Sequence, residues 1–280
     1  MMGGSWALAL KKNGFAGERV GWDRPEVLER ARARGAIDRA AASVAEAVRD
    51  ADLIYLALPV LGILDLLPEV GRAARAGALI TDAGSTKARI CRHAQEHVPA
   101  QVHFLGGHPM AGKETGGIEN ADADLFVGAK YVVIREEESA EEIGEPVAEF
   151  LAWVRRAGAE PVWLDAETHD WAVALVSHAP QLVSTALASA VWDETDEDGL
   201  PVRLAAGGFR SLIQKAGSPY DIWRDICLTN SGNIGRALER LEQRLKRVRE
   251  NLRSPELAEE FEKARRTLEA LRGSGRNPDE

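Results

Sequence analysis

The sequence predicts an α/β fold in which a doubly wound parallel sheet is followed by an all-helical domain. Up to about residue 165, short apolar runs of strand length alternate with helical segments, which is typical of a parallel sheet with helices on both faces. Beyond that point apolar residues recur only at helical spacing. We therefore expect a sheet domain over 1–165, incomplete at its N-terminal end, a helical domain over 166–272 and a polar tail over 273–280.

The elements of the sheet domain are expected in a regular order. After an opening helix, strands are predicted over about 20–23, 53–59, 78–82, 102–105, 130–134 and 161–164, with helices over 25–34, 61–75, 86–97 and 140–157. Pro25 suits the first turn of a helix, because an N–H there has no helical partner. The run from Leu53 to Pro59 is apolar throughout, as in a strand buried on both faces.

The C-terminal part is expected to be helical. Apolar residues with three-four spacing predict one helix that ends near Ser254-Pro255 and a second helix after it: Ile234, Leu238, Leu241, Leu245, Val248 and Leu252, then Phe261, Ala264, Leu268 and Leu271. The stripe is short for a coiled coil, so packing in a bundle or dimer is favoured.

Composition limits the classes of partner. The 280 residues carry 35 Lys and Arg against 44 Asp and Glu, a net charge of −9, which does not favour nucleic acid. Two cysteines, Cys91 and Cys227, provide neither a disulfide framework nor metal-site spacing, so no metal is expected. Apolar runs shorter than a membrane span and the lack of a signal-like start favour a cytoplasmic protein that binds a small molecule.

The first residues match the second half of a dinucleotide-binding motif. In the Rossmann arrangement a strand leads into a glycine-rich turn at a helix N-terminus, and an acidic residue about 20 positions later holds the ribose. Gly3 and Gly4 open a helix, and Asp23 ends the next strand at that distance. The preceding strand and first glycines have no counterpart, so we expect an internal or otherwise truncated start. The alternative is that Gly3-Gly4 is a flexible start and Asp23 a turn residue.

The expected cofactor is NAD. An Asp23 carboxylate would repel the 2′-phosphate of NADP, whereas the neighbouring Arg24 keeps NADP as the less favoured choice. Leu58 and Pro59, at the end of the next strand, complete the expected cofactor-binding set.

Three polar segments are expected to form loops beside the ligand: 82–87, 106–114 and 177–181. In the second segment, His108 lies between glycines and is followed by a proline, a setting that suits ligand contact better than core packing. Its imidazole could act as an acid or base near neutral pH. The alternative is a structural histidine.

Several segments together resemble the prephenate and arogenate dehydrogenases of tyrosine biosynthesis. The resemblance is carried, in order, by Asp82-Ala83-Gly84-Ser85-Thr86-Lys87, Gly107-His108-Pro109-Met110-Ala111-Gly112-Lys113-Glu114, Ala121-Asp122-Ala123-Asp124-Leu125-Phe126, His169-Asp170, Ser177-His178-Ala179-Pro180, Gly207-Gly208-Phe209-Arg210 and Trp223-Arg224-Asp225-Ile226. It extends from Gly3 to about residue 250.

This resemblance implies a cytoplasmic, homodimeric prephenate dehydrogenase that uses NAD to convert prephenate oxidatively to 4-hydroxyphenylpyruvate and carbon dioxide. It implies that His108 accepts the proton of the 4-hydroxyl group and that Ser85 orients this imidazole. It gives Glu114 a gating or polarising role, with an exposed loop carboxylate as the alternative.

By the same resemblance, the helical domain lines the substrate side and forms the dimer. The implied substrate-binding residues there are His178, Gln181, Gly207, Gln214, Lys215 and Trp223. Gln214 stands where prephenate users commonly have an arginine, so Lys215, Arg210 or a partner subunit would have to supply the charge.

The alternatives are arogenate or dual cyclohexadienyl dehydrogenase activity, a related Rossmann dehydrogenase for another hydroxy acid, and a truncated inactive protein that only dimerises or binds a partner.

Overall fold

The computed structural model describes residues 1–113, 115–135 and 144–273. The chain forms two compact units, Met1–Ser231 and Gly232–Glu280. The sequence predicts a boundary near residue 165, where strands are followed only by helices. This boundary separates types of element rather than compact units, and it stays a prediction. The expected polar tail over 273–280 lies outside the described residues except for Gly273.

The first part of the larger unit alternates strands and helices. Its strands are β1 (Val20–Gly21), β2 (Arg39–Ala40), β3 (Leu53–Leu56), β4 (Leu79–Asp82), β5 (His103–Leu105), β6 (Gly107–Pro109), β7 (Lys130–Ile134) and β8 (Glu160–Leu164). Its helices are α1 (Met2–Lys12), α2 (Pro25–Ala33), α3 (Val44–Val48), α4 (Val60–Ala73), α5 (Ala88–His97), η1 (Ile118–Asn120) and α6 (Glu145–Arg156).

The strands pair in three ladders. β1 pairs with β2, and β3, β4 and β5 pair in that order, all parallel. β7 pairs in parallel with β8 and in antiparallel orientation with β6. The predicted Rossmann-like α/β class is confirmed, with β6 as an antiparallel strand that the sequence did not predict.

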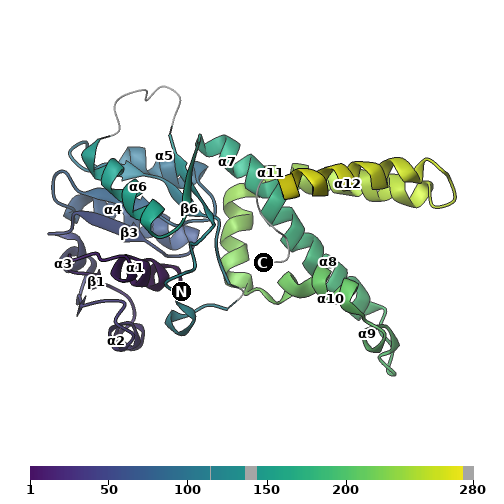
Figure 1. Ribbon diagram of the computed structural model, residues 1–280, viewed down its shortest axis with the longest axis horizontal. Helices are drawn as coiled ribbons and strands as arrows, with labels where there is room; N and C mark the ends of the chain where they lie inside the picture. Colours follow the sequence, from purple (N-terminus) through teal and green to yellow (C-terminus); the bar gives the residue numbers. More distant parts are fainter. Residues whose placement is uncertain (114, 136–143, 274–280) are drawn as a thin grey trace. The chain divides into compact units, whose positions relative to one another are not determined.

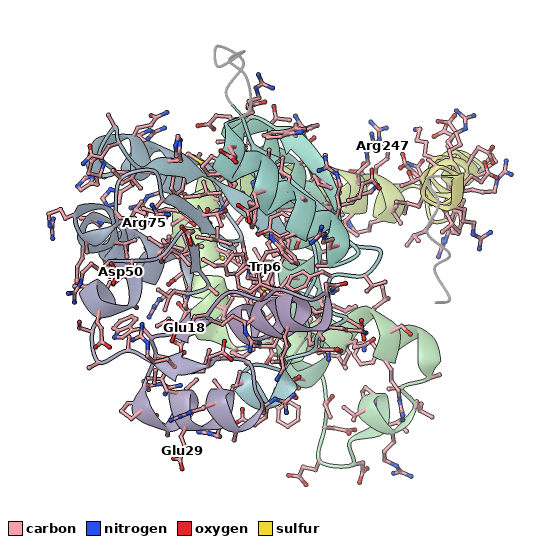
Figure 2. The ribbon with its side chains drawn as sticks, turned by 60° about the vertical axis from the view of Figure 1, so that its left-hand side comes forward. Trp6, Glu18, Glu29, Asp50, Arg75 and Arg247 are labelled. Atoms are coloured by element: carbon pink, nitrogen blue, oxygen red, sulfur yellow. The ribbon has the colours of Figure 1, made fainter. Side chains whose placement is uncertain are left out.

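Alternation along the strands builds two cores, one on each face. Ile54 and Leu56 of β3 pack with α3, α4 and α5, whereas Leu53 and Tyr55 pack on the opposite side with α1 and α6. β4 shows the same alternation. Figure 1 shows β3 between α4 and α1, and Figure 2 shows Trp6 of α1 inside the unit. Helices therefore cover both faces, as in a doubly wound sheet.

The long apolar strands and their helices lie within a few residues of their predicted positions. The structure adds β2, α3 and β6, each only two to five residues long. Such short elements contain too few residues to show a periodic pattern. The structure describes the predicted helix over 140–157 from Glu145 onward.

Helices follow the last strand. They are α7 (Ala166–Val173), η2 (Ala174–His178), α8 (Ala179–Asp193), α9 (Leu200–Arg203), α10 (Gly207–Ile213), η3 (Gln214–Gly217), α11 (Tyr220–Glu250) and α12 (Leu257–Gly273). The segment 177–181, expected as a loop, lies inside the continuous run α7–η2–α8. That expectation was wrong because the η2 turn is a π-helix, whose different hydrogen-bond pattern accommodates Pro180 without ending the helix.

The run Ala166–Asp193 is long and apolar enough to cross a membrane by length and composition alone. It also carries His169 and Asp170, which are fully buried and hydrogen-bonded to residues of the sheet domain. These contacts give the run a place in the folded core of its unit.

The smaller unit contains the C-terminal part of α11 together with α12. Ion pairs from Arg244 and Arg247 of α11 reach Glu260 of α12 within this unit. α11 ends at Glu250, four residues before the predicted end at Ser254.

Candidate active site

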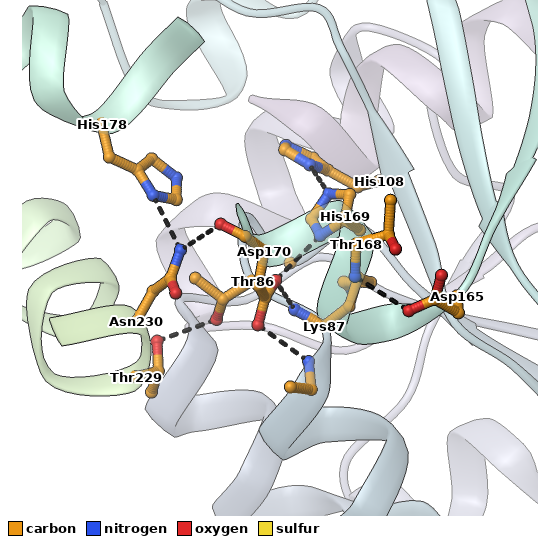
Figure 3. Close-up of polar contacts among 12 residues, drawn as sticks. Thr86, Lys87, His108, Asp165, Thr168, His169, Asp170, His178, Thr229 and Asn230 are labelled. Atoms are coloured by element: carbon orange, nitrogen blue, oxygen red, sulfur yellow. Dashed lines mark hydrogen bonds and ion pairs between the residues drawn. The ribbon is translucent and has the colours of Figure 1, made fainter. Parts of the chain in front are cut away.

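The candidate site lies where β4 ends and β6 begins, at the carboxyl edge of the sheet. β4 ends at Asp82, and the chain then runs through Ser85 to Lys87 at the start of α5. β6 places His108 beside α7 of the helical run. Figure 3 shows polar side chains from these segments and from α11 converging there.

Two histidines and one aspartate form a continuous hydrogen-bonded chain. Nδ1 of His108 lies 2.8 Å from Nε2 of His169, and Nδ1 of His169 lies 2.8 Å from Oδ1 of Asp170. His169 and Asp170 are buried, whereas His108 is half-buried. Only the outermost imidazole is therefore open to a ligand.

The order of donors in this chain fixes the tautomer of His108. An ionised carboxylate only accepts hydrogen bonds, so His169 donates its Nδ1–H to Asp170 and keeps a lone pair on Nε2. His108 then donates its own Nδ1–H to that lone pair. Nε2 of His108 is left with a free lone pair, which is the form a general base needs.

Asp170 is held at the N-terminus of α5. Its Oδ1 accepts the backbone N–H of Lys87 at 2.7 Å, and its Oδ2 accepts that of Ala88 at 3.0 Å. These amides are among the first N–H groups of a helix, which have no partner within it. The helix start thus stabilises the carboxylate and fixes the position of the histidine chain.

A buried ion pair lies under the same edge. Lys87 Nζ contacts Asp82 and donates to the carbonyl of Gly107 at 2.7 Å. Asp82 also accepts the backbone N–H groups of Gly84 at 2.8 Å and Gly107 at 3.1 Å. Gly107 is required here, because a Cβ would lie 2.6 Å from the carbonyl oxygen of Asp82. This pair ties β6, and with it His108, to the end of β4.

The surroundings lower the pKa values of His108, His169 and His178, which favours the neutral form of each imidazole. Burial, followed by the charges of His169, Lys87 and His178, holds the pKa of His108 well below 6.5. Burial also lowers the pKa of His169, although Asp170 opposes that effect. Burial lowers the pKa of His178 to about 4. A neutral His108 at physiological pH can accept a proton.

His178 is joined to the same network from the helical side. Asn230 of α11 donates to the carbonyl of Asp170 at 2.7 Å and lies 3.3 Å from Nδ1 of His178. Trp223 meets His178 edge to face, with ring centroids 6.0 Å apart. Thr86 and Thr229 are hydrogen-bonded at 2.8 Å and tie α11 to the loop that carries Ser85.

The structure brings some of the predicted substrate residues together and places others apart. His108, His178 and Trp223 belong to the network or touch it. Ser85 is half-buried in the β4–α5 loop, and His169 occupies Nδ1 of His108, so the role of Ser85 stays a prediction. Glu114 lies outside the described residues.

The remaining predicted substrate residues lie around α8, α10 and η3. The amide of Gln181 donates to the carbonyl of Lys215 at 2.7 Å and accepts from Ser218, so it ties η3 to α8. Gly207, Gln214 and the side chain of Lys215 are exposed. Their substrate roles stay predictions.

Most of the residues expected to hold a dinucleotide share one cavity. Gly3, Gly4, Asp23 and Leu58 line a cavity of about 720 Å³, with Gly3 and Gly4 in the first turn of α1. A Cβ on Gly3 would lie 3.1 Å from that of Ala57, just past the end of β3. Backbone at the start of α1 and a carboxylate past the end of β1 suit a pyrophosphate and a ribose, respectively.

The other two expected cofactor residues are not in the cavity lining. Pro59 caps the start of α4, and Arg24 precedes α2 with an exposed guanidinium near Asp23 and Glu26. Their cofactor roles stay predictions.

A separate group on α5 has the donors of a metal site. The ligand atoms of His93, Glu96 and His97 lie within 4.8 Å of one another on the accessible side of the helix. The sequence analysis expected no metal and did not identify this group.

The sequence does not indicate the parts of the site that lie behind His108. In the sequence, His169-Asp170 is only a segment that matches the family, and Lys87 is only part of a predicted loop. The available signal was a histidine next to an aspartate on a predicted helix, without any indication of its partner 61 residues earlier.

Known protein families and relatives match almost the whole chain. A family model described as the nucleotide-binding domain of prephenate dehydrogenase matches residues 6–157. One described as the prephenate dehydrogenase dimerization domain matches residues 165–269. Prephenate dehydrogenase from Lactococcus lactis subsp. cremoris is 33% identical over 285 residues, which covers 98% of this chain and 77% of that protein.

Solved structures are also similar to almost the whole chain. The crystal structure of prephenate dehydrogenase from Aquifex aeolicus in complex with hydroxyphenyl propionate and NAD+ has a TM-score of 0.88 and 26% identity, covering 96% of this chain and 94% of that one. Synechocystis arogenate dehydrogenase has a TM-score of 0.79 and 28% identity, with 96% of each chain covered.

Proposed function

The chain belongs to the prephenate dehydrogenase family of oxidoreductases, and from this premise we propose that it converts prephenate to 4-hydroxyphenylpyruvate with NAD. The observation that carries the proposal is the His108–His169–Asp170 chain, which presents a neutral imidazole with a free Nε2 at the carboxyl edge of the sheet. An alcohol being oxidised must lose a proton as its carbonyl forms, and such a group can accept it.

The residues at the start of α1 and the end of β1 would hold the cofactor. Gly3 and Gly4 offer backbone N–H groups near the pyrophosphate, and Asp23 offers its carboxylate to the ribose hydroxyls. When bound, NAD supplies the acceptor for the hydride that leaves C4 of the substrate. The Asp23 carboxylate favours NAD over NADP, because it would repel a 2′-phosphate.

His108 performs the proton transfer. Its Nε2 accepts the proton of the 4-hydroxyl group as the carbonyl forms, and its Nδ1–H remains bonded to His169. Asp170 stabilises the positive charge that develops on the imidazole pair, because it lies at the end of that chain. The bond from C1 to the ring carboxylate then breaks, carbon dioxide leaves, and the electron pair enters the ring to give a phenolate. His108 can return its proton to that oxygen.

Arogenate is the second candidate substrate, and one observation favours it. Gln214 carries no charge and is exposed, and the amide of Gln181 is engaged with η3. Lys87, a buried cation beside the network, is paired with Asp82. Arogenate bears an amino group where prephenate has a keto group, so its side chain depends less on an unpaired cation.

We also propose a cytoplasmic homodimer formed through the helical part. The run α7–η2–α8 exposes Trp171, Val176 and Trp192, which are 49%, 71% and 74% accessible. Exposed apolar residues of this size commonly mark a protein interface. The matching dimerization-domain family supports this assignment.

The test is the initial rate of NADH formation with prephenate and, in parallel, with arogenate. Turnover with prephenate supports the proposal, and turnover with arogenate alone replaces it with the second candidate. Because the pKa of His108 lies well below 6.5, kcat/KM should stay constant as the pH falls past 6.5. The control is the same assay with NADP. A chain that binds NAD but turns over neither substrate would contradict the proposed function.

A further inference from the structure

The C-terminal end of α5 carries three side chains whose atoms can coordinate a metal ion. His93, Glu96 and His97 each offer one ligand atom, and these atoms lie within 4.8 Å of one another. The three residues occupy positions i, i+3 and i+4 of one helix, which are neighbours on the same face. The helix alone therefore brings two imidazoles and one carboxylate together.

The backbone beneath this group is held by packing. Ile90 and Ala94 lie on the buried side of α5 and pack in the same core as α4. The end of the helix also lies against α4, because a Cβ on Gly71 would come within 2.8 Å of the carbonyl oxygen of His97. His93 is half-buried, and the other two side chains of the group are exposed. An ion would therefore have to order side chains only, which lowers the entropic cost of binding.

One hydrogen bond fixes which nitrogen of His97 is free. Its Nδ1 lies 3.1 Å from the carbonyl oxygen of His93. Because a carbonyl oxygen only accepts, Nδ1 carries the proton and Nε2 keeps the lone pair that a metal ion requires. Histidines that coordinate a metal commonly donate their other ring N–H to a backbone carbonyl, since this bond orients the ring.

The two imidazole rings are stacked. Their centroids lie 4.1 Å apart, and their planes differ by 29°. Zn–N bonds of about 2.0 Å place two nitrogens of a tetrahedral ion about 3.3 Å apart. Small rotations of the two side chains, without movement of the backbone, therefore suffice to bring one nitrogen from each ring onto an ion.

The position at the end of a helix also favours a cation. α5 ends at His97, and the carbonyl groups of its last turn carry the negative end of the helix dipole. Glu96 adds a full negative charge, whereas the nearby cation Arg92 lies 3.8 Å from Glu167 of α7. The other end of the same helix binds the carboxylate of Asp170 through backbone N–H groups. Each end of α5 thus suits a charge of the opposite sign.

We propose that His93, Glu96 and His97 bind a divalent transition-metal ion such as Zn²⁺, Ni²⁺ or Cu²⁺. Imidazole nitrogen is a preferred ligand of these ions, whereas Mg²⁺ and Ca²⁺ prefer sets of oxygen ligands. Nε2 of His97, one ring nitrogen of His93 and one oxygen of Glu96 supply three ligands. Water supplies the fourth ligand of a tetrahedral ion.

This site is separate from the histidine network around His108. Ala88, whose amide binds Asp170, lies at the first position of α5, and His97 lies at the last. A helix rises by about 1.5 Å per residue, so these two positions are about 13 Å apart along the axis. The ion can therefore be tested without reference to the proposed dehydrogenase activity.

The first experiment is calorimetric titration of the full, chelator-treated chain with ZnCl₂ at about pH 7.5. Loss of an outer-shell partner already costs about 10-fold to 100-fold in metal affinity, so His93→Gln and His97→Gln should each raise Kd by more than about 10-fold. His103→Gln is the matched control, because His103 is an exposed histidine of β5 outside the group. It should leave Kd unchanged, and MgCl₂ should not compete with zinc.

A second experiment identifies the ligand atoms by ¹⁵N spectroscopy of histidine-labelled protein. Zinc should shift Nε2 of His97 and leave Nδ1 protonated, because Nδ1 donates to the backbone. A ring nitrogen of His93 should shift at the same zinc concentration. The rings of His108 and His169 should keep their signals.

Three results would overturn the proposal. The first is an equal Kd in the parent, His93→Gln and His97→Gln, with circular dichroism showing all three to be folded. The second is a zinc-induced shift confined to the rings of His108, His169 and His178, which would place the ion in the histidine network. The third is competition by Mg²⁺ at equal affinity, which would indicate a site made of carboxylates. None of these readouts depends on turnover, so failure of the proposed function would be seen separately.

Discussion

The hydrogen-bonded network around His108, His169 and Asp170 and the open strand edges of β1 and β3 differ in how their buried polar groups are satisfied. Around His108, polar groups from the β4–α5 loop, β6, α7 and α11 are joined by hydrogen bonds, and each carboxylate oxygen of Asp170 has a backbone donor. Between β1 and β3, the outward backbone groups of Leu53 and Tyr55 have no ladder partner, and the indole of Trp6 has none among the described residues. A network with every member satisfied holds one geometry, whereas an open edge remains available for pairing.

This difference predicts where single substitutions should destabilise the protein most. In the network, removing one group leaves its partner buried and unpaired, so single substitutions should be costly. At the open strand edges, removing a group that has no partner among the described residues should cost little.

The largest expected effect is on His108. His108→Asn removes the base at Nε2, so kcat should fall by about 1000-fold, within the range for a lost general base. NAD affinity should change by less than about twofold, because the role assigned to His108 is in the chemical step. Steady-state kinetics and fluorescence titration of NAD measure the two quantities. A large loss of NAD binding with intact chemistry would refute the role given to His108.

The next effect is the pH dependence of stability. The folded protein keeps His178 neutral down to a pKa of about 4, whereas the unfolded chain takes up that proton near 6.5. Stability is therefore complete above 6.5 and falls as the pH drops toward 4, by about 3 kcal/mol from His178 alone. His108 and His169 act in the same direction.

Urea unfolding at pH 7, 5 and 4 measures this dependence. His178→Gln should make it smaller, because glutamine does not titrate. An identical pH dependence in the variant and the parent would assign the loss to other groups.

Asp170→Asn should have a somewhat smaller effect on turnover. It removes the charge that orders the donors of His169 and His108, and we expect kcat to fall by about 100-fold. The acidic limb of kcat/KM should move to lower pH, because Asp170 raises the pKa of His169. Glu167→Gln on the same helix is the control, since Glu167 is exposed and should leave kcat unchanged. A lowered kcat with an unmoved pH profile would point to a structural effect only.

The smallest effect is expected at Trp6, which packs beside the open edge of β3. Trp6→Phe removes an N–H that has no hydrogen-bond partner among the described residues. The free energy of unfolding should therefore fall by less than about 1.5 kcal/mol, as for other conservative apolar exchanges. The matched change in the network is Asn230→Leu, which removes a donor to Asp170 and should cost about 2 kcal/mol. Denaturant unfolding measures the loss of unfolding free energy in both variants. A larger loss for Trp6→Phe than for Asn230→Leu would contradict this prediction.

Much of the sheet domain could be predicted because its signals are local. The apolar run that begins at Leu53 and the helix that begins at Pro25 can both be predicted from a few neighbouring residues. His108 could be singled out because glycines and a proline surround it in the chain. β6 could not be predicted, because a three-residue strand exists only through pairing with β7.

The chain of hydrogen bonds behind His108 could not be predicted for the same reason. His169 lies 61 residues after His108, and Asp170 is separated by more than 80 residues from the backbone amides that hold it. Residues so far apart in the sequence come into contact only because the helical run packs on the sheet. A local sequence pattern does not indicate this packing.

The sequence by itself determined the fold class, the order of the long strands and helices, the family and the histidine at the centre of the site. These depend on periodicity and on residue types that are neighbours in the chain. Only the tertiary structure decided which side chains partner that histidine, that Gln181 ties η3 to α8, and that β1 and β3 each have an edge unpaired by any strand of the described residues. The physical reason is that hydrogen bonds and edge pairing depend on positions in space, which are fixed only when distant segments pack together.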